Sequence, residues 1–225
     1  MSDWPSEHPA GDDAYLQPYR RAVEHFGATF DATLWKNRAY QTVRFDVLRQ
    51  MVDLEGLTLL DAGCGLGDLC AFLHERNVRL RQYIGVDGVP AIVAGATQRR
   101  LPRAEFHYRD FVSDADALTI GHPDVIYFSG SLNTVPEAAA RRVVERAWSA
   151  ARRGVVFNFL SDRASPESMA RDTGPARRFD TLEWLEWALR ATTLVRFRQD
   201  YLGGHDATIA MMRDPAGAPT PGAIE

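Results

Sequence analysis

Two hydrophobic periods alternate along the chain. Short apolar runs, typical of buried strands, occupy residues 58–61, 82–86, 104–108, 125–129 and 154–159. Longer stretches between them carry apolar residues three or four positions apart, as in Val43, Val47 and Met51, which is the spacing of one helix face. The pattern therefore predicts strands that alternate with helices.

The predicted helices cover residues 14–26, 36–51, 68–76, 90–99, 134–151 and 180–191. Pro90 suits the first turn of its helix. Thr134-Val135-Pro136-Glu137 and Asp180-Thr181-Leu182-Glu183 both match the capping-box pattern, the first with a proline inside the first turn. Trp184 and Trp187 lie three positions apart and are expected to pack in the core rather than to form a binding cage.

Strands that alternate with helices predict an α/β fold, a parallel sheet with helices on both faces. Two final strands, 193–201 and 207–212, are joined by a short turn at Gly203-Gly204 and must therefore pair antiparallel. We expect one domain over residues 14–213, made of N-terminal helices (14–56) and a core (57–213). The Pro- and Gly-containing ends, 1–13 and 214–225, are expected to be mobile tails.

Composition narrows the class of protein. The 225 residues suffice for one α/β domain, and the formal net charge of −4 gives no general attraction for nucleic acid. The two cysteines, Cys64 and Cys70, lack both a metal-ligand pattern and a secreted disulfide pattern. No apolar run has the length of a signal or membrane segment, which favours a cytoplasmic protein with no membrane partner.

The most informative stretch is residues 59–67, an apolar run that ends in Asp61 and continues through Gly63, Gly65 and Gly67. A strand, a tight glycine turn and a helix start bring backbone against a nucleotide-like ligand. A dinucleotide fingerprint would place its third glycine one position later, where Asp68 stands. This spacing argues against an NAD(P)-dependent oxidoreductase, which is kept as the weaker alternative.

The pattern resembles the first motif of class I S-adenosylmethionine-dependent methyltransferases. Three further segments stand where that family expects them, namely 84–87, 109–111 and 124–129, and the resemblance spans roughly 35–213. Residues 157–161 and 204–209 look similar to uncharacterised bacterial members. The resemblance implies a Rossmann-like, seven-stranded, mostly parallel sheet of order 3-2-1-4-5-7-6. It also implies S-adenosylmethionine as methyl donor and S-adenosylhomocysteine as product. A metal is not implied, because the sequence has no clustered carboxylates near the strand at 125–129.

The resemblance carries over to single residues. The expected cofactor contacts are Asp61, Gly63, Cys64, Gly65, Gly67, Asp87, Gly88, Asp110, Phe111, Ser129 and Arg44. Asp87 would accept from the two ribose hydroxyls, or else cap the next helix. Asp110 would accept from the adenine amino group beside Phe111, or else form a loop turn. Arg44 would meet the methionine carboxylate, with Arg38 a weaker candidate, or else lie on a solvated helix face.

Buried Asp61 would orient the glycine loop or meet the cofactor's amino group through water. On the acceptor side, the loop Ser129-Gly130-Ser131-Leu132-Asn133 lacks the Asn-Pro-Pro-aromatic motif of enzymes that methylate nucleic-acid bases. His205 is a weak candidate for a general base, because its turn falls at the cofactor edge of the sheet. Residues 161–178 form either a lid or a surface loop. We expect a small-molecule acceptor, with a non-catalytic cofactor-binding protein as the alternative.

Overall fold

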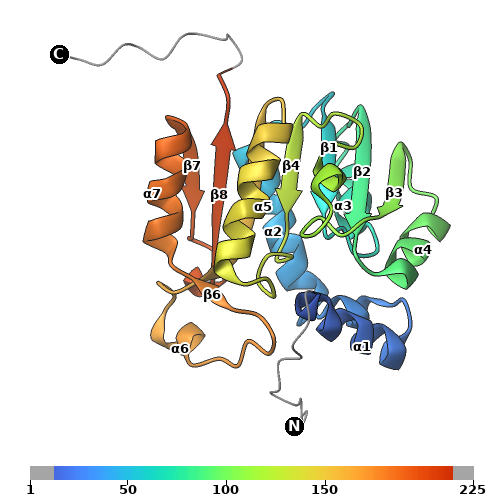
Figure 1. The fold of residues 1–225 in the computed structure, drawn as a ribbon, viewed down its shortest axis with the longest axis horizontal. Helices are drawn as coiled ribbons and strands as arrows, with labels where there is room; N and C mark the ends of the chain where they lie inside the picture. Colours follow the sequence, from blue (N-terminus) through green and yellow to red (C-terminus); the bar gives the residue numbers. More distant parts are fainter. Residues whose placement is uncertain (1–12, 215–225) are drawn as a thin grey trace.

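The computed structural model describes residues 13–214 (Figure 1). Almost all of both predicted tails lies outside these residues. At the N-terminal boundary, Asp13 forms an ion pair with Arg20 and is therefore tied to the folded chain. None of the helices in residues 13–214 is both long enough and apolar enough to span a membrane.

A twisted sheet forms the centre, with strand order β3-β2-β1-β4-β5-β8-β7. Its strands are β1 (Thr58–Ala62), β2 (Gln82–Asp87), β3 (Ala104–Tyr108), β4 (Val125–Phe128), β5 (Gly154–Ser161), β7 (Leu194–Arg198) and β8 (Asp206–Met212). The first five run parallel, whereas β8 is antiparallel to both β5 and β7. The predicted Rossmann-like fold and strand order are confirmed, with the two closing strands now numbered 8 and 7.

An additional strand was missed from the sequence. β6 (Arg178–Phe179) pairs parallel with Leu160 and Ser161 at the end of β5. Two residues carry no readable periodicity, so this strand could not be found from the hydrophobic pattern. Phe179 is instead held by tertiary packing, because its ring stacks on Trp184 with centroids 5.6 Å apart. Trp184 is completely buried, which confirms that it packs in the core.

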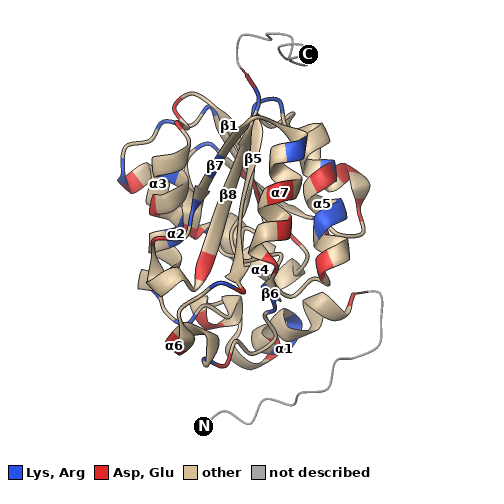
Figure 2. Cartoon of the chain, turned by 90° about the vertical axis from the view of Figure 1, so that its left-hand side faces the viewer, with Lys and Arg blue, Asp and Glu red and all other residues tan. Residues whose placement is uncertain are grey.

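Helices cover both faces of the sheet (Figures 1 and 2). The bounds are η1 (Ala14–Leu16), α1 (Gln17–Phe26), η2 (Phe30–Thr33), α2 (Arg38–Met51), α3 (Asp68–Glu75), α4 (Pro90–Gln98), η3 (Ala115–Leu118), α5 (Glu137–Ala150), α6 (Pro166–Met169), α7 (Thr181–Ala191) and η4 (Leu202–Gly204). Because side chains alternate along a strand, Leu59 packs in the cluster under α2 and α3, and Leu60 in the one under α5 and α7. Both faces of the sheet are therefore core.

One of the two predicted capping boxes is wrong. Pro136 occupies the N-cap position of α5, and no side chain caps that helix end. Glu137 instead accepts hydrogen bonds from the Trp184 indole at 2.6 Å and from the Asp180 backbone at 3.3 Å. The N-cap of the other is confirmed, since Asp180 accepts from the backbone of Leu182 and Glu183 at 3.0 Å each, although the Asp180 N–H donates to Glu137 and not to Glu183. Local sequence could not reveal that Glu137 has a long-range partner.

Candidate active site

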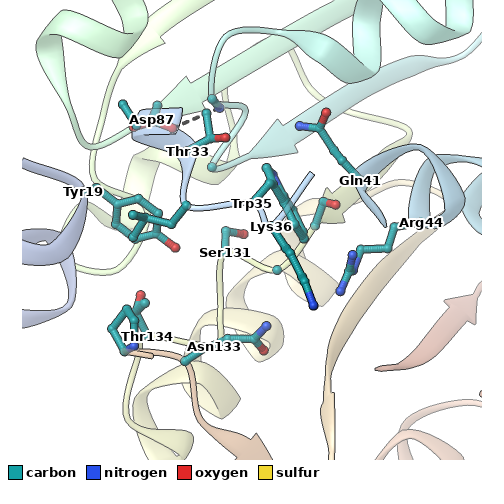
Figure 3. A pocket seen from close by; sticks show the side chains of 18 of the residues that line it. Tyr19, Thr33, Trp35, Lys36, Gln41, Arg44, Asp87, Ser131, Asn133 and Thr134 are labelled. Carbon is teal, nitrogen blue, oxygen red and sulfur yellow. Dashed lines mark hydrogen bonds between the residues drawn. The ribbon is translucent and has the colours of Figure 1, made fainter. Parts of the chain in front are cut away.

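A cavity of about 530 Å³ opens at the carboxyl ends of the parallel strands, and residues of α1 and η2 are among those that line it (Figure 3). In the ribbon, α1 lies beyond this end of the sheet (Figure 1). This volume lies within the range of small-molecule sites, which is roughly 300–1,000 Å³. Strand order reverses between β1 and β4, and open α/β sheets bind ligands at such a point. The cavity therefore stands where the fold predicts a ligand.

The glycine turn borders this cavity through Gly63 and Gly65, but not through Gly67. All three have positive φ, at 82°, 54° and 76°, which side chains disfavour. A Cβ on Gly67 would lie 2.7 Å from the Phe106 ring, so this glycine serves core packing. A Cβ on Gly65 would have only Thr33 within 4 Å, at 3.4 Å. Gly65 thus leaves space on the cavity side of the turn.

Asp87 ties this turn to the end of β2. Its carboxylate accepts from the backbone of Gly65 at 3.1 Å and of Val89 at 3.0 Å (Figure 3). Burial raises its pKa to about 6. Each oxygen keeps a second lone pair for a ligand hydroxyl. The N-cap position of α4 belongs to Val89, and neighbouring Gly88 lines the cavity where a Cβ would lie 2.9 Å from Leu16.

Asp61 presents a buried carboxylate to the cavity. One oxygen accepts the Tyr83 hydroxyl at 2.5 Å, while Oδ1 has no hydrogen-bond partner. Burial raises its pKa to about 7, and the nearby carboxylates of Asp87 and Asp68 act in the same direction. Ser129, also in the lining, has a similarly unpartnered buried hydroxyl. Buried polar atoms without partners are rare in proteins, and a bound ligand is one explanation for them.

Cys64 lies between the two cavity glycines and also lines the cavity. Its thiol is buried, and burial raises its pKa well above the ordinary value. A neutral thiol of this kind is a small apolar wall rather than a nucleophile.

Arg44 is buried, so the alternative of a solvated helix face is wrong. Its guanidinium pairs with Asp206 through Nη2 at 2.6 and 2.8 Å and through Nε at 3.2 Å. Nη1 donates to the Tyr40 carbonyl at 2.7 Å, and the Trp35 ring covers the group at 4.5 Å. Arg44 does line the cavity, but most of its donors are committed within the protein. Arg38 is exposed and does not line the cavity.

Of the third predicted pair, Phe111 lines the cavity and Asp110 does not. Asp110 accepts the Tyr15 hydroxyl at 2.5 Å, the Ser113 hydroxyl at 2.7 Å and the Val112 backbone at 3.0 Å. The bond to Val112 is the loop turn that the sequence left open. The carboxylate of Asp110 also anchors η1, because Tyr15 belongs to η1. Tyr15 itself lines the cavity. Adenine binding by Asp110 stays a prediction.

The loop after β4 forms the floor towards β5. The Ser131 hydroxyl donates to the Ala62 carbonyl at 2.6 Å, and the Gly130 backbone donates to Asn158 at 2.8 Å. Asn133 accepts from the Leu160 backbone at 3.3 Å. These bonds hold the loop in one conformation against the glycine turn.

His205 also lines the cavity, and its Nδ1 lies 3.2 Å from Nη2 of Arg178. Burial lowers its pKa, the three arginines 178, 44 and 171 act in the same direction, and Asp206 opposes them. Within 161–178, residues 171–173 and 175–176 line the cavity, so this segment is a wall of the site.

Several lining residues were not predicted from the sequence to belong to the site. They are Tyr15, Leu16, Tyr19, Trp35, Lys36, Tyr40, Gln41 and Thr134. Most belong to the N-terminal elements, which carry no motif and reach the site only by folding over the sheet. Among residues 13–214, no group of three or more His, Cys, Asp or Glu side chains could hold a metal ion.

Comparison with known proteins agrees with this architecture. Residues 59–154 match the family model described as a methyltransferase domain. No curated protein matches the sequence. The solved structure of the DhpI–SAM–HEP complex has 18% identity and a TM-score of 0.62, covering 92% of this chain and 100% of that one. These results agree with the predicted resemblance of the chain to class I S-adenosylmethionine-dependent methyltransferases.

Two further solved structures share the fold. Magnesium protoporphyrin IX methyltransferase from Synechocystis PCC 6803, with bound SAH, has 15% identity and a TM-score of 0.62, covering 88% of this chain and 94% of that one. The methyltransferase SibL in its apo form has 15% identity and a TM-score of 0.64, covering 87% of this chain and 61% of that one. At such identities the likeness concerns the fold alone.

Proposed function

We propose that this protein binds S-adenosylmethionine in the cavity and transfers its methyl group to a small-molecule acceptor. The observation that carries this proposal is the cavity itself, in which an open glycine turn meets the buried carboxylate of Asp61 and the half-buried carboxylate of Asp87, both with acceptor capacity left over. A ligand that offers hydroxyl and amino donors at opposite ends of a nucleoside-like body fits that arrangement.

Each of these site residues would contact a different part of S-adenosylmethionine. Asp87 would accept from the ribose hydroxyls, because each of its oxygens retains a lone pair. Asp61 Oδ1, which lacks a partner, would accept from the amino group of the methionine part. Phe111 would contact the adenine, and the last Nη1 proton of Arg44 would reach the methionine carboxylate. Asp110 Oδ1 accepts only from the Val112 backbone and keeps a lone pair, but Asp110 does not line the cavity and would have to move to reach the adenine amino group.

When bound, S-adenosylmethionine supplies an electrophilic methyl group on a sulfonium for in-line displacement. The protein's own contributions are alignment and exclusion of water. The walls formed by Tyr19, Trp35 and residues 171–173 and 175–176 would enclose the reacting groups. A base is needed only if the acceptor atom must lose a proton.

The test begins with calorimetric titration of the purified protein with S-adenosylhomocysteine and, separately, with NAD. We expect binding of the first at micromolar concentration and none of the second. Transfer of label from S-adenosylmethionine to a panel of small molecules would then follow. Binding of NAD would overturn the proposal, whereas cofactor binding with no transfer to any acceptor would favour the non-catalytic alternative.

A further inference from the structure

The end of the cavity around His205 carries uncompensated positive charge. Four charged groups act on this histidine, namely Arg44, Arg171, Arg178 and Asp206. The single carboxylate among them is fully buried and paired with Arg44. Arg171 and Arg178 form no ion pair with any carboxylate in residues 13–214. The group of four carries a net charge of two positive units. The exposed Asp172, which also lines the cavity, offsets one of them and leaves an excess of one.

Arg178 also determines which nitrogen of His205 carries the proton. A guanidinium has only donors, so in the contact of 3.2 Å its Nη2 donates and Nδ1 of His205 accepts. The proton of the neutral imidazole is then on Nε2. Arg178 is itself fixed by bonds to the carbonyls of Ser161 at 2.7 Å and Ser168 at 2.5 Å.

The Nε2 edge is the one available to a ligand. His205 lines the cavity, and its Nδ1 edge is engaged by Arg178, which does not line the cavity. No residue between 13 and 214 forms a hydrogen bond with Nε2 of His205. His205 thus offers an N–H donor, and the lone pair that a general base would use is already engaged by Arg178.

Arg171 provides the second group. It lines the cavity, its side chain is exposed, and in the described part of the chain its guanidinium has no hydrogen-bond or ion-pair partner. The acid beside it, Asp172, is exposed and accepts from the Gly174 backbone at 2.8 Å. Lys36, a lining residue just before α2, adds another positive charge. Its ammonium group lies over the Tyr40 ring, 5.7 Å from the ring centroid.

We propose that the methyl acceptor carries an anionic oxygen group, a carboxylate or a phosphate-type group, which binds Nε2–H of His205 and the guanidinium of Arg171. Arg178 acts as the positioning residue that holds the histidine in its donor form. This inference rests on the proposed function. Three strand spacings of about 4.8 Å separate β2, which ends in Asp87, from β5, which lies beside His205, so the anion would sit far from the ribose end.

The experiment is nuclear magnetic resonance of the full chain labelled with ¹⁵N-histidine and saturated with S-adenosylhomocysteine. The His205 signals are assigned as those lost in His205→Gln. Sodium phosphate and sodium acetate are titrated separately at constant ionic strength, balanced with sodium chloride. We expect an Nε2–H tautomer in the starting protein and a saturable shift of its signals. A response to phosphate or to acetate identifies which oxygen group the site prefers.

Three variants sharpen this test. Arg171→Gln should weaken the anion's apparent affinity about tenfold, since a charged hydrogen bond is lost. Arg177→Gln, in the same segment but outside the cavity lining, should leave it unchanged. Arg178→Gln should shift the tautomer equilibrium of His205, which a purely structural role for Arg178 would not require.

The proposal is overturned if neither anion gives a saturable shift, or if Arg177→Gln weakens the response as much as Arg171→Gln. It is also overturned if the anions displace S-adenosylhomocysteine, because the site would then be that of the methionine carboxylate. Calorimetry with S-adenosylhomocysteine in the absence of both anions tests the proposed function separately.

Discussion

Arg44 and Asp206, 162 positions apart in sequence, form a buried bidentate ion pair at 2.6 and 2.8 Å. The pair joins α2 to the start of β8, and both partners are almost completely buried. It therefore holds α2 against the end of the sheet where β8 begins, next to His205. Arg44 thus combines a structural role with its place in the cavity lining.

Breaking this pair should destabilise the fold. Arg44→Met would leave Asp206 buried without compensation and should lower the free energy of unfolding by about 3–5 kcal/mol. The double variant Arg44→Met/Asp206→Leu should recover much of that loss, because no charge remains buried. Urea denaturation of both variants and the wild type measures the difference. A loss below about 1 kcal/mol in the single variant would show that the pair contributes little.

Stability should depend on pH through Asp61. Its pKa of about 7, against an ordinary 3.8, means that the folded state retains a proton that the unfolded chain releases. This contribution is present at low pH and is lost as pH rises from about 4 to about 7, with a slope of up to about 1.4 kcal/mol per pH unit. Asp61→Asn does not titrate and can still accept from Tyr83, so its stability relative to wild type should increase with pH.

Urea denaturation at pH 5 and pH 8 checks this behaviour. The exposed control Asp116→Asn should follow the wild-type pH profile. Parallel profiles for Asp61→Asn and the wild type would mean that Asp61 titrates near its ordinary value in the fold.

Cofactor affinity should depend on Asp87. Asp87→Ala removes the acceptor for Gly65 and the proposed acceptor for the ribose, and should weaken S-adenosylhomocysteine binding by roughly 1–3 kcal/mol. Calorimetric titration beside Asp116→Asn provides the measurement and its control. Unchanged affinity would remove Asp87 from the binding site.

Gly65 and Gly67 should respond differently to substitution. Gly65→Val directs a branched side chain to the open side of the turn and should abolish S-adenosylhomocysteine binding, while most of the fold survives. Gly67→Ala places a methyl group against Phe106 and should mainly lower the free energy of unfolding, by more than about 1 kcal/mol. Calorimetry and urea denaturation of both variants separate the two effects. Normal binding by Gly65→Val would mean that the ligand does not approach this turn.

Much of the architecture could be predicted because its signals are local. The apolar run before Asp61, the alternate glycines and the acid at the end of β2 are each set within a few positions, and their order gives the resemblance to class I methyltransferases. Where a partner is distant the prediction failed or stayed open. Glu137 was expected to cap its own helix but bonds Trp184, and β6 is held by Phe179 against that same tryptophan.

The sequence by itself determined the alternation of strands and helices, the glycine turn and the acids at the strand ends, because backbone geometry and hydrophobic periodicity depend on near neighbours. Only the tertiary structure decided that Arg44 pairs with Asp206, that Asp110 holds Tyr15, and that Arg178 engages Nδ1 of His205. The physical reason is that a buried polar side chain needs a hydrogen-bond partner. The tertiary fold decides which groups lie close enough to be that partner, and they can be far away in sequence.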